Sequence, residues 1–117
     1  MTYPDVSPST PDAPYPGRLL RDLLFPACQL TVSQAARELG LSRQNLYRIL
    51  DGTTPITPET AARLGRFCDV PASFWLHLQG ECDLRRVEAS LASVLPLIAK
   101  RTLSAGVWTQ LGATGGR

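Results

Sequence analysis

One short stretch of the chain carries side chains that suit hydrogen bonding to nucleic-acid bases and phosphates. Between Gly40 and Gly52 the sequence reads GLSRQNLYRILDG, with hydroxyl, guanidinium and amide groups around a few large apolar residues. Gln and Asn can pair with the edge of adenine, and Arg can pair with N7 and O6 of guanine. No acidic residue lies between Glu38 and Asp51 to repel a phosphate. A merely solvated helix more often carries Glu and Lys pairs four residues apart, so the stretch favours DNA binding.

A helix beginning after Ser42 would sort these side chains onto two faces. Leu46 and Ile49 would point inward, with Tyr47 on the opposite side. Phosphate contacts are expected on the flanks from residues that could equally be plain capping or turn residues. The candidate DNA-binding residues are Gln34, Ser42, Arg43, Gln44, Asn45, Tyr47, Arg48, Thr53 and Thr54.

The preceding residues predict a second helix that packs against this one as a helix-turn-helix. Thr31 and Gln34 form a capping box, and Gly40 suits a left-handed helix end. Close packing of such a pair needs a small residue in the first helix, a residue that tolerates positive φ in the turn, and an apolar residue inside the second. Ala36, Gly40 and Leu46 occupy these three places.

Proline and capping residues delimit further helices. PGRLLRDLLFP has Pro16 in its first turn, and Pro26 is expected to stop the run. Thr57 caps a helix with Pro58 at its first position, expected to continue to about residue 68. A fifth helix is expected from Pro71. No segment alternates with period two, so the predicted fold class is all-α.

Beyond residue 80 a different apolar spacing predicts helix pairing. Leu84, Val87, Leu91, Val94 and Ile98 recur at intervals of three and four residues, as in a short coiled-coil seam, with Pro96 expected to kink or end the helix. The alternative is that this helix folds back on its own domain. A separate apolar cluster around Trp108 is either docked on the domain or kept for a partner. The candidate dimer or partner contacts are Leu84, Val87, Leu91, Val94 and Trp108.

Composition and length limit the remaining possibilities. A chain of 117 residues with 44% hydrophobic residues is sized for one domain. We expect a disordered arm over 1–14, a domain with a C-terminal helix over 15–101 and a flexible tail over 102–117. No apolar run reaches the roughly 18 residues of a membrane helix, and the N-terminus does not resemble a signal peptide, so a cytoplasmic location is expected.

The residues that carry catalysis or bind metals in other proteins are sparse here. The three cysteines are widely spaced, and the single histidine has no acidic or thiol partner near it in sequence. This pattern is typical of partly buried cysteines in a reducing compartment rather than of a disulfide framework or a zinc site. We therefore expect no enzyme activity, no cofactor and no metal.

Three segments together resemble the HigA antitoxins within the Xre/Cro-like helix-turn-helix class. They are YPGRLLRDLL, LTVSQAARELGLSRQNLYRILDGTTPIT and FWLHLQGECDL. The resemblance implies a five-helix, lambda-repressor-like domain, usually dimeric, that represses its own operon and binds a RelE-like, mRNA-cleaving toxin. The chain departs from the family pattern at Tyr15, where histidine is usual, and at His77, where asparagine is common. By the resemblance, the operator contacts fall on Ser42, Arg43, Gln44, Asn45 and Arg48.

The expected partners are thus palindromic operator DNA, a second copy of the chain and a RelE-like toxin. A domain this small covers few base pairs, so a two-fold dimer on a palindrome is the usual way to gain affinity. Two alternatives stay open: a free-standing Xre or phage-type repressor without a toxin, and a protein-interaction adaptor that no longer binds DNA.

Overall fold

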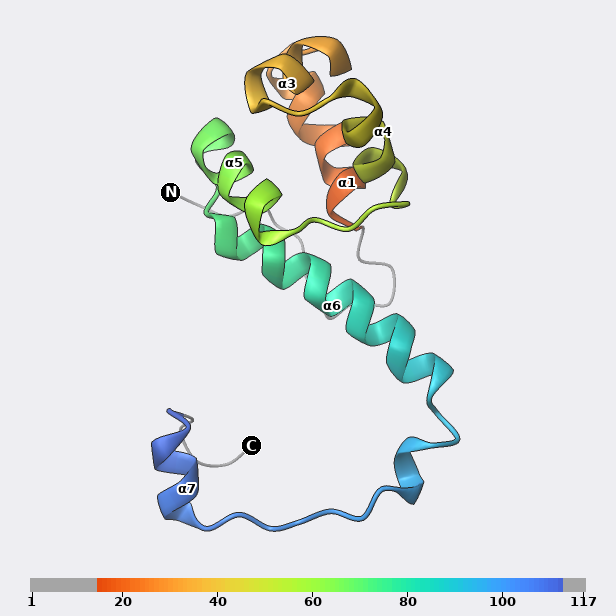
Figure 1. Cartoon of the computed structure of the whole chain (residues 1–117), viewed down its shortest axis with the longest axis vertical. Coiled ribbons are helices and arrows are strands. Elements are labelled where there is room, and N and C mark those ends of the chain that lie inside the picture. The colour runs from red at the N-terminus through yellow and green to blue at the C-terminus, as the bar shows by residue number, and fades with distance from the viewer. Residues whose placement is uncertain (1–14, 113–117) are drawn as a thin grey trace. The chain divides into compact units, whose positions relative to one another are not determined.

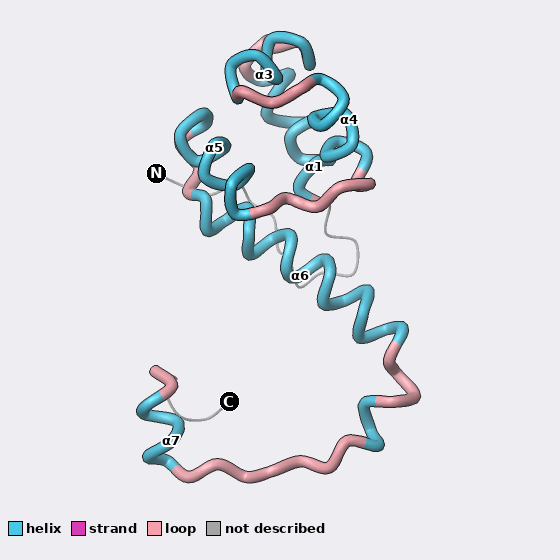
Figure 2. The backbone as a smooth tube through the Cα atoms, viewed as in Figure 1, coloured by secondary structure: helices cyan, strands magenta, loops and turns pink. Residues whose placement is uncertain are grey.

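The computed structural model describes residues 15–112, and all regular structure within that range is helical (Figures 1 and 2). The predicted disordered arm over 1–14 lies outside the described residues. The elements are α1 (Pro16–Leu19), the π-helical segment η1 (Leu20–Leu24), α2 (Phe25–Ala27), α3 (Val32–Leu39), α4 (Arg43–Asp51), α5 (Pro58–Cys68), α6 (Ala72–Ser90), the 3-10 segment η2 (Leu95–Leu97) and α7 (Ala105–Gln110). The chain divides into two compact units between Val87 and Glu88.

The first helical stretch continues past the proline that was expected to stop it. Pro16 does stand at the first helical position, but α2 includes Pro26 and ends at Ala27. The turn just before the proline is a π-helix in which the Phe25 amide donates to the Leu20 carbonyl, five residues back. A proline ring collides with the carbonyl four residues earlier in a regular α-helix, and a π turn changes that register. The stretch therefore accommodates Pro26 instead of ending at it.

Helices α3 and α4 begin and end where the capping residues predicted. The Thr31 and Gln34 side chains form the full capping box at the start of α3. The Ser42 hydroxyl accepts a hydrogen bond from the Asn45 amide at 3.0 Å, which caps α4. Both helices end at glycines in the left-handed region, with φ of 74° at Gly40 and 81° at Gly52. These boundaries are the ones that the local sequence signals predict.

The core lies where all five helical stretches of the first unit meet. The α5 helix starts at the predicted cap, because the Thr57 hydroxyl accepts from the Thr60 amide and Pro58 takes the first position. The α6 helix contributes Trp75, which is fully buried and meets Phe74 edge-on with ring centroids 5.3 Å apart. The buried apolar residues are Leu19, Leu20, Phe25, Ala35, Ala36, Leu39, Leu46, Ile49, Leu50, Ile56, Ala61, Leu64, Val70, Phe74, Trp75 and Leu78.

The residues after 90 do not form the continuous helix that the spacing of the apolar residues predicted. The α6 helix ends at Ser90, so Leu91, Val94 and Ile98 do not share a helix with Leu84. The chain then forms short turns, such as the bond from the Val94 amide to the Leu91 carbonyl. A proline at position 96 disfavours helical conformation in the residue before it, and a helix without tertiary packing gains little from continuing. The prediction of one continuous seam was therefore wrong.

Within the stretch predicted as a flexible tail, residues 105–110 form helix α7. The Ser104 hydroxyl caps it by accepting from the Val107 amide at 3.4 Å. No described residue from 88 to 112 is buried, and Trp108 is half-buried. As far as residue 112, the second unit thus has defined local structure but no buried core.

Candidate nucleic-acid interface

The outer face of α4 presents polar side chains to solvent. Arg43, Gln44 and Arg48 are exposed, and Tyr47 is 52% exposed. The opposite face is closed against the core, with Leu46 only 1% exposed. This is the separation into two faces that the sequence predicted. The outer side chains lie outside the core and are accessible to a ligand.

The α4 backbone is fixed from behind by the start of α1. A Cβ added to Gly17 would lie 1.9 Å from the carbonyl oxygen of Ile49, so no side chain fits between the two helices at this point. The Tyr15 hydroxyl donates a hydrogen bond to the Leu50 carbonyl at 3.0 Å. Orphan carbonyls at a helix end need such a partner. The Tyr15-Pro16-Gly17 sequence at the start of α1 therefore positions α4.

Sequence reasoning missed the role of Tyr15 and treated it as a departure from the family pattern. The hydrogen bond joins residues 35 positions apart, and no local pattern could indicate it. The Tyr15 ring also lies beside Gly52, where an added Cβ would meet one of its carbons at 3.1 Å.

The turn between α3 and α4 is fixed by an arginine from α5. Nη1 of Arg63 donates to the Leu39 carbonyl at 2.9 Å, while Nη2 pairs with Glu59 at 3.1 Å. The same guanidinium lies against Gly40, where any side chain would meet it at 2.6 Å. Arg63 thus satisfies the C-terminal end of α3 and closes the turn that orients α4.

Two of the predicted contact residues already use part of their hydrogen-bonding capacity. Oε1 of Gln34 accepts from the Thr31 amide at 3.1 Å, so its amide NH2 is the group with donors to offer. The Ser42 oxygen accepts from the Asn45 amide, and Asn45 is half-buried. These residues shape the ends of α3 and α4 as well as facing solvent.

Thr53 and Thr54, the predicted phosphate contacts after α4, are held by hydrogen bonds from their backbone amides to one carbonyl group. The Thr53 and Thr54 amides both donate to the Arg48 carbonyl, at 2.9 and 3.1 Å. Their backbone donors are therefore consumed inside the protein. Any phosphate contact from this loop has to use the hydroxyl groups, of which Thr53 is the more exposed residue.

A hollow beside the outer face of α4 adds two residues that the sequence did not single out. It has a volume of about 320 Å³ and lies between α3 and the start of α4. Nη1 of Arg43 lies 3.5 Å from the Ser33 hydroxyl across it, and Arg37 lines the same hollow. Arg37 and Ser33 were missed because both look like ordinary exposed positions of an amphipathic helix.

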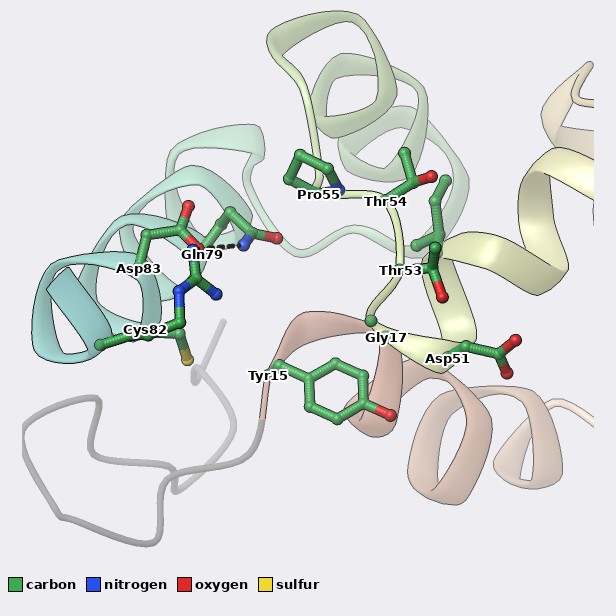
Figure 3. A pocket seen from close by; sticks show the side chains of 12 residues that line it. Tyr15, Gly17, Asp51, Thr53, Thr54, Pro55, Gln79, Cys82 and Asp83 are labelled. Carbon is green, nitrogen blue, oxygen red and sulfur yellow. Dashed lines mark hydrogen bonds and ion pairs between the residues drawn. The ribbon is translucent and has the colours of Figure 1, made fainter. Parts of the chain in front are cut away.

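A second pocket of about 330 Å³ lies at the C-terminal end of α4 (Figure 3). Tyr15, Asp51 and Gln79 contribute to its lining from three different helical stretches and their ends. The Gln79 side chain accepts from the Ile56 amide at 2.8 Å and so connects α6 to the loop before α5. Burial raises the pKa of the Cys82 thiol in this pocket, which favours the protonated thiol at neutral pH.

The candidate dimer or partner contacts are all outside the core. Leu84 and Val87 lie on α6 and are 49% and 43% exposed. Leu91 and Val94 lie in the turns that follow, and Trp108 lies on α7. The structure does not bring these residues together on one helix face.

Residues 15–112 hold neither a metal-binding cluster nor a membrane-spanning helix. Within that range no group of three or more His, Cys, Asp and Glu side chains is placed to hold a metal ion. In the same described part of the chain, no helix combines the length and the apolar character needed to cross a bilayer.

Comparison with known proteins places this geometry in a family. The helix-turn-helix domain family matches residues 17–73. An uncharacterized HTH-type transcriptional regulator of Haemophilus influenzae is 30% identical over 94 residues, which span 75% of this chain and 88% of that protein. The Pseudomonas aeruginosa antitoxin HigA, solved with the higBA promoter, superposes with a TM-score of 0.70 at 29% identity, covering 77% of this chain and 98% of HigA. The chain belongs to the family of helix-turn-helix regulators that includes the HigA antitoxins.

A further structure supports the placement within the HigA-related proteins. The antitoxin GraA in complex with its operator matches with a TM-score of 0.69 at 26% identity, over 78% of this chain and 92% of GraA. The expected all-α, Xre/Cro-like fold is confirmed by these neighbours. Since HigA is covered almost completely while about a quarter of this chain is unmatched, the HigA-like body is accompanied here by additional sequence.

Proposed function

We propose that the chain binds operator DNA through α4 and represses its own operon, as an antitoxin of the HigA type. The observation that carries the proposal is the outer face of α4, which is polar, basic and exposed while its backbone is fixed by Gly17, Tyr15 and Arg63. A reading helix must hold its side chains in a rigid register to discriminate base edges.

The contacts divide into base readout and phosphate binding. Arg43 and Gln44, in the first turn of α4, are assigned to base edges in the major groove, because the N-terminal end of the second helix enters the groove in this motif. Arg48 and the hydroxyls of Thr53 and Thr54 are assigned to phosphates, as is the amide NH2 of Gln34. Arg37 joins this second group, since it lines the hollow beside Arg43.

The DNA contacts are tested by measuring, with fluorescence anisotropy, the affinity of the protein for the promoter of its own gene. Arg43→Ala or Gln44→Ala should weaken operator binding by roughly 1–3 kcal/mol and relax specificity at one base position. Affinity should fall steeply with salt as phosphates are neutralised by the basic side chains. Arg66→Ala removes the same charge from an exposed position on α5 and is the matched control.

An equal loss on operator and random DNA would assign the altered side chain to phosphate instead of a base. If the protein does not bind the promoter, or binds it with an affinity that does not depend on salt, the adaptor alternative is favoured over a DNA-binding protein.

The antitoxin role is the second part of the proposal. It is supported by the structural similarity of this chain to the antitoxins HigA and GraA. The expected partner is a RelE-like toxin encoded beside this gene, and the expected assembly is a homodimer on a palindrome. Co-expression with the adjacent reading frame should yield a copurifying complex and restore growth that the neighbour alone arrests. Operator binding without either result would identify a free-standing repressor.

A further inference from the structure

Tyr47 is an exposed aromatic side chain on the outer face of α4. It is 52% exposed, and it is the one aromatic among the exposed large apolar residues of the described range, 15–112. The inner face of the same helix is formed by Leu46, Ile49 and Leu50, which are buried. Tyrosine is a weaker helix former than Ala, Lys or Glu, so its presence does not serve the stability of α4. Its ring is instead open to a ligand.

The position of Tyr47 places it beside the residues assigned to base edges. It follows Gln44 by three residues and Arg43 by four, and residues at these spacings are neighbours on a helix surface. Tyr47 lies one turn, about 5 Å, further along α4. Nη1 of Arg43 lies 3.5 Å from the Ser33 hydroxyl, on the side of α3, and the Tyr47 ring is left about half exposed. A helix that lays Arg43 and Gln44 against base edges therefore brings the Tyr47 ring into the same groove.

The chemistry of an aromatic ring is matched by one group of the major groove. The base pairs present hydrogen-bond donors and acceptors there, and the C5-methyl group of thymine is the apolar exception. Contact between the ring and this methyl group removes apolar surface of both from water. Cytosine and uracil lack the methyl group, so the contact distinguishes thymine from both.

We propose that Tyr47 is a specificity-determining residue that recognises a thymine of the operator by packing its ring against the C5-methyl group. The inference rests on the proposed function, because it requires α4 to lie in the major groove. Arg43 and Gln44 recognise bases by hydrogen bonds, and Tyr47 adds an apolar contact to this polar face. Phosphate contacts are assigned to Arg48 and to the loop after α4, so the role of the ring does not depend on the phenol hydroxyl.

The test compares thymine with uracil in the operator, because the two bases differ only by the methyl group. Fluorescence anisotropy with the full chain measures the affinity for promoter fragments in which each thymine is replaced in turn by deoxyuridine. For the wild type, the replacement at one position of each half-site should weaken binding by about fourfold, the effect expected for one buried methyl group.

Three variants show whether Tyr47 makes this contact. Tyr47→Ala should bind the thymine and uracil operators equally, because the ring is gone, whereas Tyr47→Phe should keep the wild-type preference for thymine. Leu23→Ala removes an apolar side chain that is 49% exposed on η1, and as the matched control it should keep both the affinity and the preference. The urea midpoint of Tyr47→Ala should match that of the wild type, since the side chain lies outside the core.

A second substitution in the DNA separates the methyl group from the identity of the base pair. Replacing the recognised thymine by cytosine, with guanine opposite, should weaken binding by the wild type. Replacing that cytosine by 5-methylcytosine returns a methyl group to the same place in the major groove. The wild type should then regain about fourfold in affinity. Tyr47→Ala should regain nothing.

The possible outcomes distinguish this inference from the proposed function. The thymine contact is refuted, and DNA binding stands, if the wild type binds the promoter with steep salt dependence but no uracil substitution changes its affinity. The same holds if Tyr47→Ala keeps the preference for thymine. If Tyr47→Phe loses as much affinity as Tyr47→Ala, equally on both operators, the hydroxyl binds a phosphate and the proposal is overturned. If the wild type does not bind the promoter, the proposed function fails and this inference fails with it.

Discussion

Helices α4 and α7 begin with the same kind of cap, but α4 packs into the core and α7 is exposed. A serine hydroxyl caps each of them, Ser42 at 3.0 Å and Ser104 at 3.4 Å from the amide three residues on. The α4 helix buries Leu46, Ile49 and Leu50, whereas α7 buries none of its residues. The comparison shows that capping decides where a helix starts, while distant apolar partners decide whether it is held.

The largest expected effect comes from removing a tryptophan from each region. Trp75→Ala should cost roughly 3–5 kcal/mol of unfolding free energy, because a fully buried indole leaves a large cavity. Trp108→Ala should change it by less than about 0.5 kcal/mol. Urea unfolding followed by circular dichroism at low protein concentration measures both. Comparable losses would mean that α7 is docked on the helix-turn-helix body.

A second comparison concerns two glycines of the first unit. Gly17→Ala should destabilise by roughly 1–3 kcal/mol or more, since its methyl group would collide with the Ile49 backbone. Gly80→Ala, on α6 with no atom within 4 Å of the new methyl group, should instead stabilise by about 0.5–1 kcal/mol through helix propensity. Shifts of the urea midpoint give the two signs, and a neutral Gly17→Ala would contradict the close contact of α1 with α4.

The smallest effect is expected at the two serine caps. Ser42→Ala should lower global stability by about 1 kcal/mol, because α4 unfolds together with the core. Ser104→Ala should leave the global transition unchanged and only speed amide hydrogen exchange within α7. Exchange measured by mass spectrometry or NMR distinguishes the two, and a global effect of Ser104→Ala would again connect α7 to the body.

Most of the fold could be predicted from sequence because its signals are local. The capping box at Thr31, the left-handed glycines and the proline at position 58 act within a few residues, and the structure confirms each of them. The outward face of α4 followed from helical periodicity. Its DNA contacts stay a prediction until binding is measured.

The features that the sequence did not predict are of two kinds. Two are hydrogen bonds between residues far apart in the chain, and one is the early end of a helix that has no apolar surface to pack against. The Tyr15 bond to Leu50 spans 35 residues and the Arg63 bond to Leu39 spans 24. No periodicity encodes such pairs. The apolar seam after residue 84 looked helical because its spacing is helical, but nothing in its spacing tells whether a packing surface exists to sustain the helix.

The separation of the two faces of α4 has an evolutionary consequence. The residues that hold α4 in place point inward or come from α1 and α5, while Arg43, Gln44 and Arg48 lie outside the core. Substitutions there change the chemistry offered to a ligand without opening the core. Under the proposed function, descendants of one ancestral gene could change their target sequence by substitutions at these positions while the scaffold stays unchanged.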